Sequence, residues 1–160
     1  MAIQEKMQTT LLIIKPDGVQ RGLIGKIVSR FEDKGFMIVG MKMMTISKEL
    51  AHTHYDAHKA RPFFNGLVRF MTSSPVVVLA VRGLNAIDVC RKMMGATFGF
   101  KAEPGTIRGD YGVSTSYNLI HGSDSPEAAQ RELGLFFKAG EVQDLNLGNL
   151  GWIYDLAEEG

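Results

Sequence analysis

The fold can be worked out from one stretch near the start of the chain, Thr10-Leu11-Leu12-Ile13-Ile14-Lys15-Pro16-Asp17-Gly18. Its apolar run predicts a buried β-strand, and Pro16 with the Asp17-Gly18 pair predicts the turn that ends this strand. Lys15 is therefore expected at the point where the strand ends.

An amphipathic helix is predicted directly after this turn, over residues 23–34. Gly35 supplies the stop signal at its C-terminus. Residues 36–45 are β-like in composition, so the first part of the chain predicts a β-α-β unit. The apolar residues that recur at helical spacing are Ile24, Ile27, Val28 and Phe31.

A helical insertion is predicted between residues 47 and 70, before a strand over residues 76–81. Ser47 offers an N-cap for a helical stretch that runs toward Lys59, and Pro62 restarts the chain before a second, short helix. This second helix is expected to place three residues on one face, Phe63, Leu67 and Phe70.

The second half of the chain predicts a helix, a long loop, a last strand and a final helix. Asn85 and Gly95 are expected to cap the first of these helices. The density of glycine and proline in residues 96–112 predicts a long ordered loop without regular structure, and such loops are often functional. The last strand is expected within residues 113–120, and Ser125-Pro126 should start the final helix. Its expected buried face holds Ala129, Leu133 and Phe136.

This order of elements predicts a ferredoxin-like split βαβ sandwich, an α/β (α+β) architecture. A four-stranded antiparallel sheet would be covered by helices and would carry a helical insertion and a long Gly/Pro loop. With 160 residues, of which 45% are apolar, the chain is expected to form a single domain over residues 1–160.

The composition narrows the classes of function. The formal net charge is +1, so no overall field would attract nucleic acid or an anionic membrane. Cys90 is the only cysteine, which excludes an internal disulfide and fits a reducing cytoplasm. The polar start and the short apolar run near it predict neither a signal segment nor a membrane span.

Common catalytic fingerprints do not occur. Around Gly25-Lys26, Gln20 stands where a Walker A loop needs its first glycine, and Ile27 stands where it needs a hydroxyl. Neither Gly-x-Gly-x-x-Gly nor Gly-x-Ser-x-Gly is present. A P-loop enzyme, a dinucleotide-binding fold and an α/β-hydrolase are therefore disfavoured.

The segment Asn118-Leu119-Ile120-His121-Gly122-Ser123-Asp124-Ser125 carries the candidate for catalysis. We expect His121 to lie between a strand and the N-terminus of a helix, where phosphate is attracted by N–H groups and the helix dipole. A neutral imidazole there would be a nucleophile facing its electrophile. Read alone, such a histidine is more often a hydrogen-bonded structural residue, and Arg91 and Lys15 are more often solvated surface cations. For Arg108 the two interpretations have equal weight.

Four motifs taken together resemble those of the nucleoside diphosphate kinase family. They are I-K-P-D-G-V-Q-R-G at 14–22, H-Y-x-x-H-K-x-R-P-F-F at 54–64, P-G-T-I-R-G-D at 104–110 and N-L-I-H-G-S-D-S at 118–125. The similarity runs without a gap from about Thr10 to Tyr154. It implies a ping-pong reaction in which a nucleoside triphosphate, usually ATP, phosphorylates His121 and a nucleoside diphosphate then removes the phosphate.

The resemblance also implies a role for individual side chains. Lys15 would contact the sugar hydroxyl and the transferred phosphate, Asn118 the ribose, and Phe63 the base by stacking. Glu132, and Ser123 near it, would support the imidazole. The residues implied to hold the phosphates are Arg91, Thr97 and Arg108, with Tyr55 near His121. Mg²⁺ would be held mainly by the nucleotide phosphates, and the assembly would be a homo-hexamer, with a tetramer as the alternative.

Two departures from the family pattern affect these expectations. Phe98-Gly99-Phe100-Lys101 follows Thr97 where many members have a polar residue and proline, which makes the path of the loop and the aim of Arg108 less certain. The chain also continues past Tyr154, so contacts between subunits are expected to differ.

Two other classes of function compete. Phe98-Gly99-Phe100 matches the aromatic centre of an RNA-binding signature, although its basic opening is missing. The set His52, His54 and His58 offers three imidazoles for zinc, but His52 and His54 cannot share a face of an intact helix.

Overall fold

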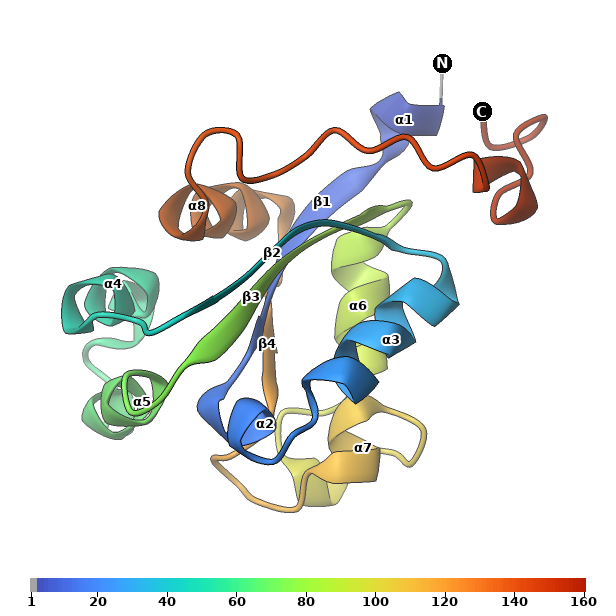
Figure 1. The fold of residues 1–160 in the computed structure, drawn as a ribbon. Helices are drawn as coiled ribbons and strands as arrows, with labels where there is room; N and C mark the ends of the chain where they lie inside the picture. The colour runs from blue at the N-terminus through green and yellow to red at the C-terminus, as the bar shows by residue number, and fades with distance from the viewer. Residues whose placement is uncertain (1–2) are drawn as a thin grey trace.

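The computed structural model describes residues 3–160 and contains one four-stranded sheet (Figure 1). Its strands lie in the order β2-β3-β1-β4, and every neighbouring pair is antiparallel. This is the sheet expected of a split βαβ sandwich. The strands are β1 (Gln8–Ile14), β2 (Met37–Met44), β3 (Val76–Gly83) and β4 (Ile120–Gly122).

Helices cover both faces of the sheet (Figure 1). One group, α4, α5 and α8, lies on one side, and α3 and α6 lie on the other. The helices are α1 (Ile3–Lys6), α2 (Pro16–Gln20), α3 (Ile24–Lys34), α4 (Lys48–His54), α5 (Phe64–Met71), α6 (Ala86–Met94), α7 (Ile107–Tyr111) and α8 (Pro126–Phe136). Short 3₁₀ turns occur at Asp56–His58, Gly99–Lys101 and Leu150–Trp152.

The central strand β1 contributes to a core on each face. Leu11 and Ile13 pack with α4, α5 and α8, whereas Leu12 and Ile14 pack with α3 and α6. Because side chains alternate along a strand, a strand buried on both faces reads as the continuous apolar run seen in the sequence. Lys15 follows β1 directly, so the predicted lysine at a strand end is confirmed.

Local signals place most helix ends as predicted. Gly35 ends α3 in the left-handed conformation, with φ of 103°, and Gly95 ends α6. The hydroxyls of Ser47 and Ser125 accept hydrogen bonds from the first turns of α4 and α8. Asn85 is the exception: it occupies the N-cap position of α6, but its side chain makes no capping hydrogen bond.

The last strand was predicted in the wrong place. β4 covers Ile120–Gly122, so only its first residue falls within 113–120, and His121 lies inside a strand instead of between a strand and a helix. Helix α8 begins five residues later. The preceding residues form turns because the Ser114 hydroxyl accepts from the N–H groups of Ser116 and Tyr117.

The prediction that residues 96–112 lack regular structure was also wrong in part. They contain the 3₁₀ turn at Gly99–Lys101 and helix α7, whose N-cap is Thr106. The Thr106 hydroxyl accepts a hydrogen bond from Gly109 N–H at 3.0 Å. A single-turn helix among glycines has too few apolar residues to show a periodic pattern.

Two expectations for the helical insertion need correction. The helix that starts after Ser47 ends at His54, short of Lys59, and a 3₁₀ turn follows. Helix α5 buries Phe64, Val68 and Met71, one position later than the predicted face of Phe63, Leu67 and Phe70. In α8 the buried residues are Ala129, Glu132 and Phe136, so a carboxylate takes the place expected for Leu133.

A glycine in α7 offers a test of this part of the fold. A Cβ at Gly109 would lie 1.8 Å from the carbonyl oxygen of Glu103, so Gly109→Ala must displace the loop or the helix. We expect a loss of about 1–3 kcal/mol of stability, the usual range for overpacking. Gly134→Ala in α8, where a Cβ meets nothing within 4 Å, is the control and should stabilise by about 0.5–1 kcal/mol. Chemical denaturation measures both, and equal effects would contradict the contact.

Candidate active site

The candidate site lies where β1 ends beside β4. His121 is paired in register with Ile13, and the two side chains point to the sheet face that α4 and α8 cover. The imidazole remains accessible, with 23% of its side chain exposed. The ring is therefore not sealed in the core.

Helix α8 supplies the closest partner of His121. The Nε2 atom of His121 and the Oε1 atom of Glu132 form a hydrogen bond, and Glu132 is 3% exposed. Burial alone would raise the pKa of Glu132, but the hydrogen bond with His121 outweighs it and holds this pKa below its ordinary value. Because the carboxylate is ionised and can only accept, Nε2 must carry the proton and Nδ1 keeps its lone pair.

Burial also lowers the pKa of His121, although the hydrogen bond to Glu132 acts in the opposite direction. Lys15 and Arg91 lower it further through their charges. At neutral pH the ring is thus in the uncharged form, which is the nucleophilic one.

His54 packs edge-on against His121, and sequence analysis missed this contact. The ring centroids lie 4.8 Å apart with an interplanar angle of 83°, and the His54 side chain is 2% exposed. Neither ring nitrogen of His54 has a hydrogen-bond partner among residues 3–160. Burial and the neighbouring His121 lower the pKa of His54 to about 3, so it stays neutral. Tyr55, next in the chain, has its ring centroid 6.4 Å from that of His121.

The three imidazoles considered for zinc do not meet. His52 packs on Phe64 and His58 on Phe63, whereas His54 points to His121. A different set, His54, His121 and Glu132, has ligand atoms within 4.8 Å of one another. Two ligands of one tetrahedral zinc ion lie ~3.3 Å apart. The hydrogen-bonded His121 and Glu132 are closer than that, so the geometry is that of an imidazole donating to a carboxylate.

Lys15, Asn118 and Thr97 form a connected group beside His121. Lys15 Nζ donates to Asn118 Oδ1 at 2.7 Å, and Asn118 Nδ2 donates to the carbonyl oxygen of Thr97 at 2.9 Å. Lys15 and Asn118 are buried, at 7% and 5% exposed, while Thr97 is exposed. Burial and the charge of Arg108 lower the pKa of Lys15 to about 8.

Arg108 lies in α7 and is 6% exposed. Its guanidinium donates to three backbone carbonyls, those of Asn118 at 3.1 Å, Gly95 at 3.0 Å and Ile120 at 2.6 Å. These three bonds use three of the five N–H groups of the guanidinium and leave the other two available to a ligand. Burial and the charge of Arg91 lower the pKa of Arg108 to about 10, so it stays charged at neutral pH.

The turn between Asn118 and His121 contains a strained residue. Leu119 has φ of 73°, a left-handed conformation that costs a bulky residue roughly 1–3 kcal/mol. Asp17 Oδ2 accepts a hydrogen bond from Leu119 N–H at 3.1 Å, and Leu119 C=O accepts one from Lys15 N–H at 2.8 Å. The sequence marks Asp17 only as part of a turn, and no local pattern marks the positive φ of Leu119 or the bond between these two residues.

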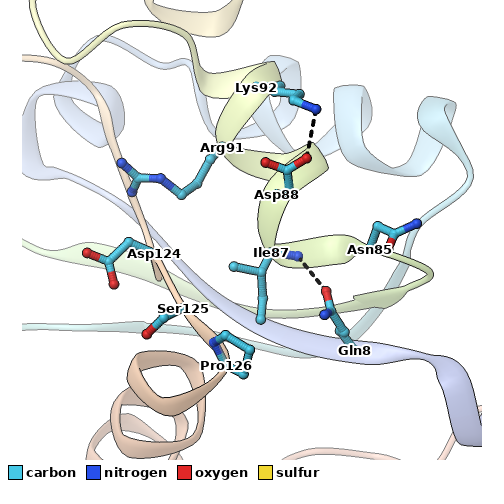
Figure 2. Close-up of a pocket in the computed structure, with 9 residues that line it drawn as sticks. All are labelled: Gln8, Asn85, Ile87, Asp88, Arg91, Lys92, Asp124, Ser125 and Pro126. Carbon is cyan, nitrogen blue, oxygen red and sulfur yellow. Dashed lines mark hydrogen bonds and ion pairs between the residues drawn. The ribbon is translucent and has the colours of Figure 1, made fainter.

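Arg91 reaches the site from the other side of the sheet. Its guanidinium donates to the Gly122 carbonyl at 2.9 Å. Figure 2 shows Arg91 extending from α6 toward the segment with Asp124 and Ser125, across a pocket of about 480 Å³. Among the predicted site residues of the described chain, only Arg91 lines this pocket.

Two further residues predicted for the site are Phe63, which is exposed, and Ser123, which is buried. Phe63 is 53% exposed and packs against His58, with ring centroids 5.6 Å apart. Ser123 is 1% exposed, its hydroxyl has no partner of normal geometry in residues 3–160, and it helps to keep the pKa of Glu132 low.

Comparison with known proteins gives a family. The family model described as nucleoside diphosphate kinase matches residues 8–142. The chain belongs to the nucleoside diphosphate kinase family. A protein of this name from Pelotomaculum thermopropionicum is 56% identical over 149 residues, which is 93% of this chain and all of that protein. The resemblance predicted from the four motifs is confirmed.

Solved structures agree. A halophilic nucleoside diphosphate kinase from Halobacterium salinarum in complex with CDP has a TM-score of 0.90 and 50% identity, over 92% of this chain and 98% of that one. A transition state mimic of the Borrelia burgdorferi enzyme with vanadate and ADP has a TM-score of 0.86 and 38% identity, over 94% and 99%. The predicted antiparallel α+β fold is confirmed.

The position of Phe98 and Phe100 argues against the RNA-binding alternative. Residues 99–101 form a 3₁₀ turn outside the sheet, so Phe98 and Phe100 do not present an RNA-binding strand. None of the helices in residues 3–160 has the length and hydrophobicity needed to cross a bilayer.

The lowered pKa of Lys15 predicts a pH dependence for nucleotide binding. As pH rises through about 8, the ammonium loses its proton and its attraction for phosphate, so the Kd for ADP should increase. Between pH 7.5 and 9.5 the phosphate groups, with a second pKa of about 6, are already ionised, and Arg108, with a pKa of about 10, stays mostly charged, so Lys15 contributes most of the change.

Calorimetric titration with ADP measures this effect. Lys15→Met should bind more weakly at pH 7.5 and show a flat profile, whereas the control Lys34→Met, at an exposed position in α3, should keep the slope. A Kd of the unchanged protein that is constant up to pH 9.5 would contradict the role of Lys15.

Proposed function

We propose that this protein transfers the terminal phosphate of a nucleoside triphosphate to a nucleoside diphosphate through a phosphohistidine at His121. The single observation that carries the proposal is the hydrogen bond between His121 Nε2 and Glu132. It leaves Nδ1 as the nitrogen with a free lone pair on a partly exposed ring. Membership of the family supports the same reaction.

In the first half-reaction, Nδ1 of His121 attacks the terminal phosphorus. A bond forms between nitrogen and phosphorus, the bond to the bridging oxygen breaks, and the nucleoside diphosphate leaves with that oxygen. Nδ1 carries no proton in this tautomer, so no base is needed to remove one. The ring becomes positively charged at nitrogen, and the Glu132 carboxylate stabilises this charge. The second half-reaction reverses these steps on a different diphosphate.

The basic residues near His121 suit the stabilisation of phosphate charge. Lys15, Arg91 and the free N–H groups of Arg108 supply positive groups from three separate segments. Phosphoryl transfer depends mainly on positioning and on such groups. We assign Thr97 and Tyr55 to the same phosphate region and Asn118, joined to Lys15, to the sugar.

Mg²⁺ fits this arrangement as an ion carried by the nucleotide. Glu132 is bonded to His121, and Asp17 Oδ2 accepts from Leu119 N–H, which leaves Asp17 Oδ1 as the only oxygen of Asp17 without a partner among the described residues. The phosphate oxygens of the nucleotide would therefore supply most of its ligands, as is common for Mg²⁺. When bound, the ion neutralises charge on the phosphates.

We further propose that residues 1–160 act as a single catalytic domain in a homo-hexamer, with a tetramer as the alternative. ATP is the proposed usual donor. A cytoplasmic location suits the buried, unpaired thiol of Cys90.

Labelling tests the phosphohistidine. Incubation with γ-labelled ATP should leave an acid-labile, base-stable label, because the bond joins phosphorus to nitrogen. His121→Ala should abolish the label, and the control His52→Ala, at an exposed position, should retain it. A label that persists in His121→Ala would refute the assignment.

The exposed ring of Phe63 predicts broad tolerance of bases. Stacking uses the π face that all bases share, at about 1–3 kcal/mol per base. Phe63→Ala should therefore raise KM about 5- to 150-fold and to a similar extent for adenine, guanine, cytosine and uracil nucleotides. Steady-state kinetics with four diphosphates measure this, with Phe100→Ala as an exposed aromatic control. A selective loss for one base would instead indicate recognition of base edges.

A further inference from the structure

The backbone between Asn118 and His121 makes an unusual turn. Ile120 N–H donates to the carbonyl of Asn118 at 2.8 Å, and Leu119 between them has φ of 73°. This is a γ-turn with a positive central φ, a rare and strained form. A leucine keeps such a conformation only where its surroundings hold it.

The contacts that hold Leu119 come from the turn after β1. Asp17 Oδ2 accepts from Leu119 N–H at 3.1 Å, and Lys15 N–H donates to Leu119 C=O at 2.8 Å. The side chain is fully buried, and a Cβ at Gly18 would come within 3.2 Å of the Leu119 carbonyl oxygen. Of these contacts, the one with Asp17 is made by a side chain and can be removed by mutation.

The turn fixes two groups of the site relative to each other. Asn118, immediately before Leu119, is bonded to Lys15 and to Thr97. His121, two residues after Leu119, is bonded to Glu132. If Leu119 relaxed to a negative φ, the chain direction between these anchored residues would change and at least one of them would move.

We propose that Asp17 is a positioning residue for phosphoryl transfer, because its carboxylate holds the Leu119 backbone in the γ-turn and so sets the place of His121 relative to Asn118. This inference rests on the proposed function, since it assigns Asp17 a part in that reaction. Asp17 acts through Leu119 and does not need to touch the nucleotide.

Asp17 could instead matter through its charge, which favours the protonated form of Lys15. Asparagine separates the two roles: its side-chain oxygen still accepts from Leu119 N–H, but it carries no charge. Alanine removes both the acceptor and the charge.

The experiment compares Asp17→Ala and Asp17→Asn in single-turnover phosphorylation of His121 by saturating ATP. A displacement of about 1 Å can cost on the order of 100-fold in rate, so Asp17→Ala should be roughly 10- to 100-fold slower. Asp17→Asn should recover most of this rate. Asp33→Ala removes an exposed carboxylate in α3 and should match the unchanged protein.

Hydrogen exchange at the Leu119 amide gives a readout independent of activity. Exchange should be slow in the unchanged protein and in Asp17→Asn and faster in Asp17→Ala. If Asp17→Ala folds poorly, Leu119→Gly supplies a second test, because glycine adopts positive φ freely. Adding Asp17→Ala to Leu119→Gly should then cost less rate than adding it to the unchanged protein.

Equal rate losses in Asp17→Asn and Asp17→Ala would assign the effect to charge and overturn the proposal. Unchanged hydrogen exchange at the Leu119 amide in Asp17→Ala would overturn it too. So would an equal rate loss when Asp17→Ala is added to the unchanged protein and to Leu119→Gly. Failure of the unchanged protein to phosphorylate His121 would refute the proposed function instead, and the exchange comparison would still decide whether Asp17 holds the turn.

Discussion

An imidazole can carry a phosphate only if one nitrogen holds its proton while the other keeps an open lone pair, and here the buried carboxylate of Glu132 meets that condition for His121. Its position depends on helix α8, which buries Ala129 and Phe136 beside Glu132 against the sheet. The packing of these apolar side chains thus buries the ionised Glu132 carboxylate, although burial of a charge costs free energy. The hydrogen bond to His121 offsets part of that cost. The hydrophobic core and the chemistry of the site therefore rest on the same helix.

The positive groups of the site show the same dependence on buried structure. Arg108 donates to the backbone carbonyls of Gly95, Asn118 and Ile120, and these bonds hold the segment around Asn118 in place. The charge of Arg108 also lies near those of Lys15 and Arg91. The pKa values of both Lys15 and Arg108 fall because burial disfavours their charged forms and because each lies near another cation, Arg108 for Lys15 and Arg91 for Arg108. A bound polyanion would relieve the repulsion between these cations. The same repulsion therefore favours ligands that carry several negative charges.

Much of the fold could be predicted because it depends on local patterns. The apolar run at residues 10–14, the helical spacing before Gly35 and the serine caps all specify their elements without reference to distant residues. The three-residue strand β4 could not be found this way, since its pairing with β1 and not its composition makes it a strand. His54 and Asp17 were missed as site residues for a related reason: their contacts with His121 and Leu119 span 67 and 102 positions of the chain. The four motifs, in contrast, identified the family because each is long enough to be specific.

The segment Phe98-Gly99-Phe100-Lys101, which differs from the family pattern in sequence, is held in place by contacts of the backbone. Gly99 sits against the backbone of Gly112, where any Cβ would lie 2.6 Å from a carbonyl atom, so the segment is tied to the chain just after α7. Phe98 and Phe100 stack outside this contact, with Lys101 above both rings. The Thr97 carbonyl accepts from Asn118, and Arg108 donates to the carbonyls on both sides of Leu119. Backbone contacts, and not the side chains at positions 98 and 100, therefore join this loop to Asn118 and orient Arg108.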